Sequence, residues 1–290
     1  MSNLTQRILV AVIAIPLIIY VAFKPYSLLG LTVIVALLAI HEFYGLAKAK
    51  GFSPQIVLGM LLTACIVVSF AHFRLQVNPT VELLPVVLIA GTISIFIAEL
   101  IKGYPNPSVQ VSATIAGALY IGMGLGGFYG IHEYFYIHGA ENPLTVDPHL
   151  VSIEAGYFLV AMLASIWICD SAAFFVGRNF GRHKIADRIS PNKTWEGAIA
   201  GLIAAIATWL LVRVYIGGLE EVSLSTAIAM GLIVGVMGQV GDFAESMLKR
   251  DAGVKDSSTL IPGHGGVLDR IDSILFVAPL TYLYLQLFGI

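Results

Sequence analysis

The sequence has few charged residues and few cysteines. Only 12% of its 290 residues are charged and 58% are hydrophobic, with a mean hydropathy of +0.87. An ordinary soluble domain carries about 25% charged residues, so the composition excludes that class and predicts an integral membrane protein. The two cysteines, Cys65 and Cys169, lie in separate apolar runs without the spacing of a metal site. We expect both to be small core hydrophobes.

Several kinds of segment are also missing. No internal repeat, low-complexity tract or soluble domain can be recognised. The apolar run 8–23 is not followed by a small-residue cleavage pattern, and further hydrophobic segments come after it, so we expect it to be retained as an anchor. The net charge of −2 indicates no particular partner, and we expect no nucleic acid to bind. Together these features predict a single membrane domain over residues 1–290.

Apolar runs of membrane-spanning length follow one another along the chain. A helix needs roughly 20 residues to cross a bilayer. The predicted fold class is therefore an all-α polytopic membrane protein with nine spans, at 7–23, 27–46, 54–72, 83–101, 111–135, 156–176, 195–216, 223–248 and 266–289. Glycines within 111–135, such as Gly124 and Gly127, would let neighbouring helices approach closely.

With nine spans, the basic residues sort to opposite sides of the membrane. Thirteen of the 16 Lys and Arg fall on one side, and three fall on the other: Lys24, Arg74 and Arg213. Cytoplasmic loops carry an excess of Lys and Arg. The N-terminus is therefore predicted inside and the C-terminus outside, with the loops 177–195 and 249–266 in the cytoplasm. His41 and Glu42 end a span on the cytoplasmic side, where they would either assist a site or form an interfacial polar cap.

The window 242–272 concentrates the charge of the chain. It holds six Asp or Glu and four Lys or Arg, between uncharged runs at 222–240 and 273–290. One face of a helix in its first part would carry an acid, a hydroxyl and two cations: Asp242, Ser246, Lys249 and Arg250. Asp269 and Asp272 are three residues apart and would share a face of the last helix, if it begins near Gly266. We expect the carboxylates of Asp242, Asp269 and Asp272 to converge on Mg²⁺, which prefers oxygen ligands.

A glycine-rich loop, P-G-H-G-G at 262–266, lies between these carboxylates. Gly265 and Gly266 permit backbone conformations closed to other residues and let N–H groups approach an anion. Four cations surround the loop: Lys249, Arg250, Lys255 and Arg270. Carboxylates for a metal beside cations and glycines for phosphates predict a metal–nucleotide site. The alternative is a set of solvated charges that only follow membrane topology, but Asp and Glu contribute little to topology.

A second polar cluster begins at Asp170, within an apolar run. An ionisable group inside a membrane helix needs a cation or metal partner. In the following loop, Lys193 and Thr194 would offer a charge and a hydroxyl to phosphates, or Thr194 would only cap the next helix. Arg178 and its basic neighbours fit either membrane topology or binding of lipid or nucleotide phosphate.

The run from Ser246 to Asp272 resembles the signature of the phosphatidate cytidylyltransferase family. It reads S-x-L-K-R-x4-K-D-x-S-x2-I-P-x-H-G-G-V-x-D-R-I-D and matches at every fixed position among its 27 residues. Two further elements of that family, D-x-x-A-Y-x-x-G-R and S-P-x-K-T-W-E-G, are similar to the residues from Asp170 and from Ser190, with Phe174 in place of the usual tyrosine. The motif likeness covers 165–275, the expected catalytic portion, and leaves 1–160 as the expected helical scaffold.

The resemblance implies transfer of a cytidylyl group from CTP to phosphatidate, which gives CDP-diacylglycerol and pyrophosphate. A lipid phosphate oxygen would attack the α-phosphorus in line, while Mg²⁺, alone or with a second divalent ion or K⁺, neutralises the developing charge. The cations that would bind triphosphate and lipid phosphate are Lys193, Lys249, Arg250, Lys255 and Arg270, with support from Ser246 and Asp256. His264 would either donate a hydrogen bond to the departing pyrophosphate or order its own loop.

The implied setting is a bacterial inner membrane, with the site facing the cytoplasm and a homodimer favoured by the glycine-rich spans. A cation transporter that uses Asp170, Asp242 and Asp269 is an alternative function. Another enzyme of CDP-alcohol chemistry is disfavoured because no D-x2-D-G-x2-A-R run occurs. A purely structural membrane protein would not need a glycine–histidine loop surrounded by cations.

Overall fold

Nearly all regular structure in the protein is helical, as predicted. The computed structural model describes residues 3–75, 82–103, 105–138, 148–217, 219, 222–261 and 263–290. The helices are α1 (Asn3–Ala22), α2 (Pro25–Ala49), α3 (Ile56–Ser69), α4 (Leu83–Lys102), α5 (Pro107–His138), α6 (Pro148–Phe180), α7 (Trp195–Tyr215), α8 (Leu224–Leu232), the π-helix η1 (Ile233–Met237), α9 (Gly238–Asp251), α10 (Leu268–Ile271) and α11 (Ile274–Phe288). An antiparallel hairpin of β1 (Lys184–Ala186) and β2 (Ser190–Thr194) precedes α7.

The described part of the chain contains six helical segments that are long and apolar enough to cross a membrane. They are Pro25–Ala49, Leu83–Lys102, Pro107–His138, Ser152–Phe180, Trp195–Tyr215 and Leu224–Asp251. Three shorter apolar helices coincide with the remaining predicted spans: Ile8–Ala22, Ile56–Ser69 and Ile274–Phe288. Every predicted span is therefore helical. That all nine cross the membrane, and in which direction, stays a prediction.

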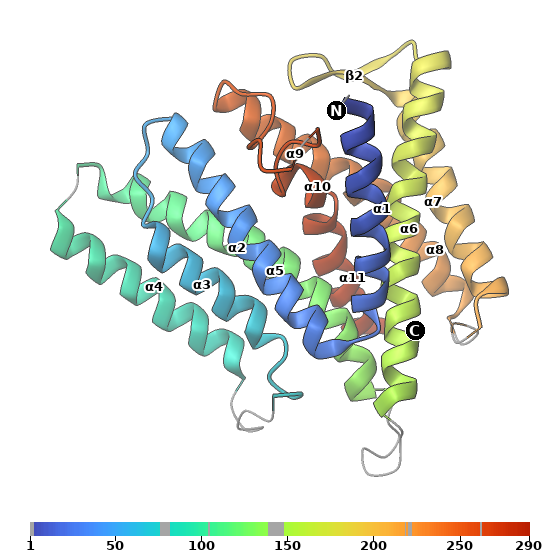
Figure 1. Ribbon diagram of the computed structural model, residues 1–290, viewed down its shortest axis with the longest axis horizontal. Helices are drawn as coiled ribbons and strands as arrows, with labels where there is room; N and C mark the ends of the chain where they lie inside the picture. Colours follow the sequence, from blue (N-terminus) through green and yellow to red (C-terminus); the bar gives the residue numbers. More distant parts are fainter. Residues whose placement is uncertain are drawn as a thin grey trace.

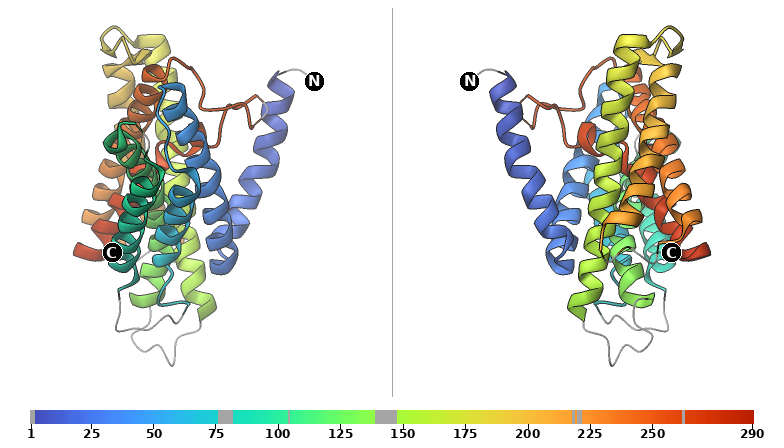
Figure 2. Two further views of the ribbon diagram at one scale, coloured as in Figure 1. Left: turned by 90° about the vertical axis from the view of Figure 1, so that its left-hand side faces the viewer. Right: turned by 90° about the vertical axis from the view of Figure 1, so that its right-hand side faces the viewer.

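Helix α5 joins the two sides of the bundle. It packs against α2 and α3 on one side and against α6 and α11 on the other, and α6 in turn packs along α7 (Figure 1). The hairpin, the N-terminus and the C-terminal ends of α2, α6 and α9 lie at one end of the molecule, while α11 runs toward the other end (Figures 1 and 2). The segments in which we predicted chemistry therefore gather at a single end of the bundle.

Two glycines permit helix contacts that position this end. A Cβ at Gly127 would lie 2.6 Å from Pro279 Cα, and one at Gly241 would lie 2.5 Å from the backbone oxygen of Asp272. Real Cβ atoms do not approach backbone this closely, so glycine is required where α5 meets α11 and where α9 meets the start of α11. The expected role of Gly127 is confirmed. The contact at Gly241 holds α9, which carries Asp242, against the segment that carries Asp272.

Two of the predicted helices are interrupted. The span 223–248 passes from α8 to α9 through the five-residue π-helix η1, next to which Ser273 Oγ donates a hydrogen bond to the Gly238 carbonyl at 3.0 Å. The last helix begins near Gly266, as predicted, but in two pieces: the four-residue α10 starts at Leu268, and α11 starts at Ile274. Asp269 lies in α10 and Asp272 is its C-cap residue, so the interruption follows both carboxylates.

Candidate active site

The ammonium group of Lys249 lies between two carboxylates near the end of α9. Its Nζ is 2.5 Å from Asp269 Oδ1 and 2.5 Å from Glu245 Oε2. Glu245 precedes Lys249 by one helical turn on α9, so the two side chains share a face, and Asp269 reaches them from α10. Glu245 is fully shielded from solvent, and Lys249 and Asp269 are each 9% exposed. Charges buried this deeply require partners, and these three supply them to one another.

Asp269 also organises the loop that precedes it. Its Oδ2 accepts hydrogen bonds from the backbone N–H of Gly266 (2.7 Å), the backbone N–H of Ser257 (2.9 Å) and the Ser257 hydroxyl (2.8 Å). Burial by itself would raise the pKa of Asp269, but the Lys249 ammonium and the Gly266 N–H outweigh it and lower the pKa to about 2. Asp269 is therefore ionised at neutral pH, with its oxygens bound to protein donors.

A second cluster joins α6, α9 and the residue that follows α10. Lys193 Nζ lies 2.6 Å from Asp242 Oδ2 and 4.3 Å from the centre of the Phe243 ring. Burial, together with the Asp242 and Asp170 carboxylates, raises the pKa of Asp272 to about 7, although Lys193 opposes the shift. Three carboxylates therefore act on one another across this cluster, with the single ammonium of Lys193 among them.

The predicted metal ligands fall into these two separate clusters. Asp269 faces Lys249 and the loop amides, whereas the carboxylates of Asp242 and Asp170 act on Asp272. Within the described residues, no group of three or more His, Cys, Asp or Glu side chains is arranged to hold a metal ion. The donor chemistry of Asp170, Asp242 and Asp272 still fits a hard cation, because a divalent ion would relieve the repulsion among their oxygens. The metal site stays a prediction.

The glycine-rich loop is held by its own backbone. Ile261 N–H donates to the Gly265 carbonyl at 2.8 Å, and His264 N–H donates to the Ile261 carbonyl at 2.9 Å. Gly265 has φ +80°, and a Cβ there would lie 2.8 Å from Asp269 Oδ2, so the position requires glycine. The Nδ1 atom of His264 is buried without a hydrogen-bond partner in the described structure. Both proposed roles of this histidine remain open.

The other predicted site residues lie around these clusters. Ser246 Oγ donates to Asp242 Oδ1 at 3.3 Å, and Arg250 Nη1 donates to the Val254 carbonyl at 2.9 Å. Four further side chains are exposed: Arg178 on α6, Lys255 and Asp256 after α9, and Arg270 on α10. Exposed cations next to buried, fixed ones can engage a soluble anion without a large desolvation cost.

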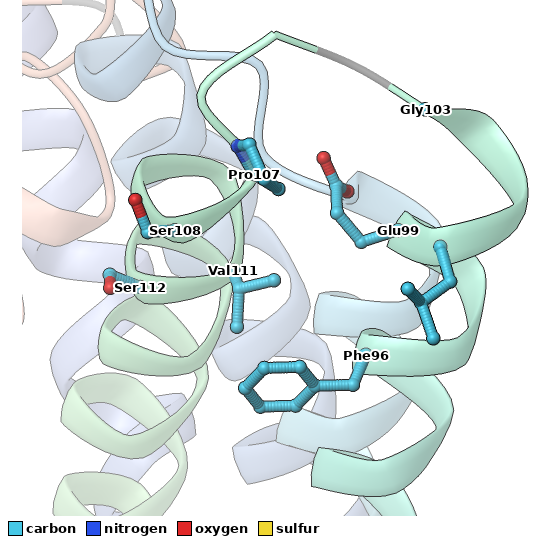
Figure 3. Close-up of a pocket in the computed structure, with 8 residues that line it drawn as sticks. Phe96, Glu99, Gly103, Pro107, Ser108, Val111 and Ser112 are labelled. Atoms are coloured by element: carbon cyan, nitrogen blue, oxygen red, sulfur yellow. The ribbon is translucent and has the colours of Figure 1, made fainter.

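An open pocket elsewhere in the bundle contains none of the predicted site residues. A cavity of about 590 Å³ between α4 and α5 is lined by apolar groups such as Phe96 and Val111, with Glu99 at its edge (Figure 3). The Glu99 carboxylate accepts a hydrogen bond from Gln55 Nε2 at 2.6 Å and is 4% exposed. This glutamate thus ties α4 to the start of α3 and is not part of either charged cluster.

Comparison with known proteins identifies the family. Residues 5–288 match the model of the cytidylyltransferase family. The phosphatidate cytidylyltransferase of Thermotoga maritima is 32% identical over 294 residues, which cover 99% of this chain and 98% of the relative. That of Synechocystis sp. is also 32% identical, over 98% of this chain and 97% of the relative. A chloroplastic phosphatidate cytidylyltransferase of Arabidopsis thaliana is 47% identical over 46% of this chain.

The chain belongs to the cytidylyltransferase family. It is therefore a nucleotidyltransferase, and the readings as a transporter or as a purely structural protein are set aside. The likeness extends from residue 5 through residue 160, a part of the chain that the sequence motifs do not cover. The N-terminal half of this cytidylyltransferase is thus as much a part of the family as the segment that carries the charged clusters.

Two residues of the candidate site were absent from the predicted set, and a third residue, Thr194, has one of the two contacts predicted for it. Glu245 went unnoticed, although its position one turn before Lys249 was a signal in the sequence. Glu42 was left undecided, and it lies buried against the glycine-rich loop rather than at a solvent interface. Thr194 caps α7, because its Oγ1 accepts a hydrogen bond from Gly197 N–H at 3.2 Å.

Proposed function

We propose that this protein transfers the cytidylyl group of CTP to phosphatidate, giving CDP-diacylglycerol and pyrophosphate. Full-length relatives that bear the name phosphatidate cytidylyltransferase support this assignment. The observation that carries it within the site is the buried Lys249 ammonium, fixed between Glu245 and Asp269 at the base of a glycine-rich loop. A cation held in place beside a loop that can bind phosphate suits a reaction in which negative charge moves from one phosphate to the next.

The reaction needs little covalent chemistry from the protein. An oxygen of the phosphatidate phosphate attacks the α-phosphorus of CTP, and the bond from that phosphorus to the bridging oxygen of the β-phosphate breaks. Pyrophosphate leaves with the electron pair of that bond. Phosphate monoesters are already anionic near neutral pH, so neither an enzyme nucleophile nor a general base is required. Positioning and charge stabilisation therefore supply the rate acceleration.

The cations of the two clusters divide this work. Lys249 and Lys193 are held in place by carboxylates, at 2.5 Å and 2.6 Å. We assign the exposed Arg250, Lys255 and Arg270 to the triphosphate, and Arg178, at the end of α6, to the lipid phosphate. We assign the glycine-rich loop at Gly265 and Gly266 to the β- and γ-phosphates, although the Gly266 N–H itself donates to Asp269. His264 would meet the departing pyrophosphate there.

Asp170, Asp242 and Asp272 would hold the Mg²⁺ that this chemistry calls for. When bound, the ion neutralises charge on the phosphate oxygens, alone or together with a second divalent ion or K⁺. That Asp269 is also a metal ligand stays a prediction. Its oxygens accept hydrogen bonds from Lys249, Ser257 and Gly266 in the structure. Ser246 orients Asp242, to which it donates a hydrogen bond, and Asp256 lies exposed next to Lys255.

The site suits a lipid substrate because both clusters lie at one end of an apolar bundle. Acyl chains can stay in the bilayer while CTP arrives from water. We infer that this end faces the cytoplasm of a bacterial inner membrane, since the basic loops 177–195 and 249–266 are there and nucleotides are cytoplasmic. The catalytic portion is then 165–275. A homodimer, favoured by the glycine-rich spans, also stays a prediction.

Product formation by the purified protein tests the function. The protein in detergent is given phosphatidate, Mg²⁺ and CTP labelled in the cytosine ring, and lipid-soluble label is measured. We expect labelled CDP-diacylglycerol with phosphatidate, and none with diacylglycerol, which lacks the attacking phosphate. Equal amounts of ATP, GTP and UTP should give far less product. No product from phosphatidate, or equal product from diacylglycerol, would contradict the assignment.

A further inference from the structure

Glu42 lies outside the sequence motifs but within the hydrogen-bond network of the glycine-rich loop. It is near the C-terminal end of α2 and is 5% exposed. Its carboxylate accepts hydrogen bonds from the backbone N–H groups of Leu268 (2.7 Å) and Val267 (3.0 Å). It also accepts from the hydroxyl of Ser258 (2.6 Å) and lies 3.1 Å from that of Ser257, whose single O–H it shares with Asp269. Four donors from one short segment thus converge on a carboxylate more than 200 residues away along the chain.

These four donors enclose the loop at its base. The two serines precede the glycines and the two backbone amides follow them, so one carboxylate ties the entry of the loop to its exit. Gly266 lies directly against it: a Cβ there would be 2.6 Å from Glu42 Oε2. Ser257 Oγ contacts both Glu42 and Asp269, and Asp269 in turn binds Lys249. The network therefore runs from α2 through the loop to the buried ammonium.

We propose that Glu42 is a positioning residue for cytidylyl transfer. It holds residues 257–258 and 267–268, on either side of the glycines, in the conformation that receives the triphosphate, and it keeps Asp269 on Lys249. This inference rests on the proposed function of the same site. Glu42 does not need to touch a substrate, because its oxygens are already occupied by four protein donors. Its contribution reaches the reaction through the loop, so its removal changes the affinity for CTP and not only the amount of folded enzyme.

The chemistry of the contact separates the available variants. A carboxylate only accepts hydrogen bonds, whereas the amide of Glu42→Gln replaces one of the two oxygens and places its N–H donors against the N–H of either Val267 or Leu268. Glu42→Asp keeps the charge but shortens the side chain by one methylene, so it can retain some of the four bonds. We therefore expect Gln to be worse than Asp, although Gln is the closer match in shape.

Steady-state kinetics with CTP and phosphatidate test the proposal. For Glu42→Gln we expect kcat/KM for CTP to fall on the order of 10- to 100-fold, with a raised KM, as is typical when a partner that orients site residues is removed. Glu42→Asp should recover part of the loss. Glu82→Gln, the same change at an exposed glutamate before α4 that makes no capping hydrogen bond, is the control and should match wild type. Unchanged KM and kcat per folded Glu42→Gln molecule would overturn the proposal and leave Glu42 a purely structural residue.

A double-mutant cycle adds a test that tolerates poor folding of one variant. Ser258→Ala removes one donor to Glu42, and its hydroxyl also accepts a hydrogen bond from Leu260 N–H. If both residues act through their contact, the effects of Ser258→Ala and Glu42→Asp on kcat/KM are not additive. Additive effects would contradict the proposed network.

Hydrogen exchange distinguishes failure of this inference from failure of the proposed function. In Glu42→Gln the amides of Val267 and Leu268 should exchange faster than in wild type, while those in the middle of α7 should not change. This measurement requires no turnover. Unchanged exchange at the two amides would overturn the positioning role whatever the activity, whereas a wild-type protein that makes no CDP-diacylglycerol would overturn only the function.

Discussion

The two charged clusters contain the same residue types and differ in how completely the protein satisfies them. At Lys249, the ammonium and the Asp269 carboxylate are buried and bound by side chains and loop amides. At Lys193, the carboxylates of Asp170, Asp242 and Asp272 oppose one another, and burial with this repulsion raises the pKa of Asp272 to about 7. In the first cluster, Lys249 and Asp269 have protein partners without a ligand. The second carries an excess of negative charge that an external cation would balance.

This difference shows that the surroundings of a carboxylate, and not its position in a sequence motif, determine its role. Asp269 and Asp272 are three residues apart, yet one has a lowered pKa and the other a raised pKa. Asp269 lies in the first turn of α10, where loop amides are available to it. Asp272 follows that helix and faces other acids. We therefore expect mutations in the first cluster to affect folding and mutations in the second to affect metal dependence.

The largest effect should come from Lys249→Met. Removing one partner of a buried ion pair leaves an uncompensated charge and costs about 3–5 kcal/mol. Here both Glu245 and Asp269 would lose their cation. The control is Lys50→Met, which breaks the exposed pair of Lys50 with Asp251 at 2.9 Å and should cost less than about 1 kcal/mol. Thermal unfolding in detergent measures both variants, and equal stability of the two would break the distinction drawn for the first cluster.

Asp272→Asn should lower turnover on the order of 10²- to 10³-fold, the range seen when one charge-stabilising group is removed from an active site. Because the second cluster loses negative charge, more Mg²⁺ should be needed for half-maximal rate, while the unfolding temperature should not fall. Asp251→Asn, at an exposed position, serves as the matched control. Near-wild-type turnover of Asp272→Asn at low Mg²⁺ would show that the second cluster does not bind the metal.

Gly241→Ala should have a smaller effect, about 1–3 kcal/mol, the usual cost of overpacking. The added Cβ would lie 2.5 Å from the Asp272 backbone oxygen and 3.1 Å from Ser273 Cα, so α9 must move away from the start of α11. Gly45→Ala is the control, since a Cβ at Gly45 has no atom within 4 Å. We expect reduced stability and a raised Mg²⁺ requirement only for Gly241→Ala. If Gly241→Ala is destabilised but needs no more Mg²⁺ than wild type, the carboxylates of Asp242 and Asp272 need not be held together.

Much of the fold could be predicted from the sequence, because apolar runs of bilayer length leave a helix little alternative. The interruptions could not: neither η1 nor the gap between α10 and α11 changes the apolar pattern. Part of the site followed from local spacing, as for Asp242 and Ser246, which were predicted on one face of α9 and are joined there by a hydrogen bond. The role of Glu42 could not follow from spacing, because its donors are remote in sequence and include backbone N–H groups, which leave no mark on residue type.

Thr194 gives the smallest expected effect and the finest test of the comparison. The sequence allowed it either to bind phosphate beside Lys193 or to cap α7, and its Oγ1 accepts a hydrogen bond from Gly197 N–H. Loss of an N-cap costs about 1 kcal/mol. Thr194→Ala should therefore lower the unfolding temperature slightly and leave KM for CTP unchanged, and Thr194→Ser, which keeps the hydroxyl, should restore stability. A raised KM for CTP in Thr194→Ala with unchanged stability would show that the hydroxyl binds substrate. The second cluster would then include Thr194 at the end of β2, one residue beyond Lys193.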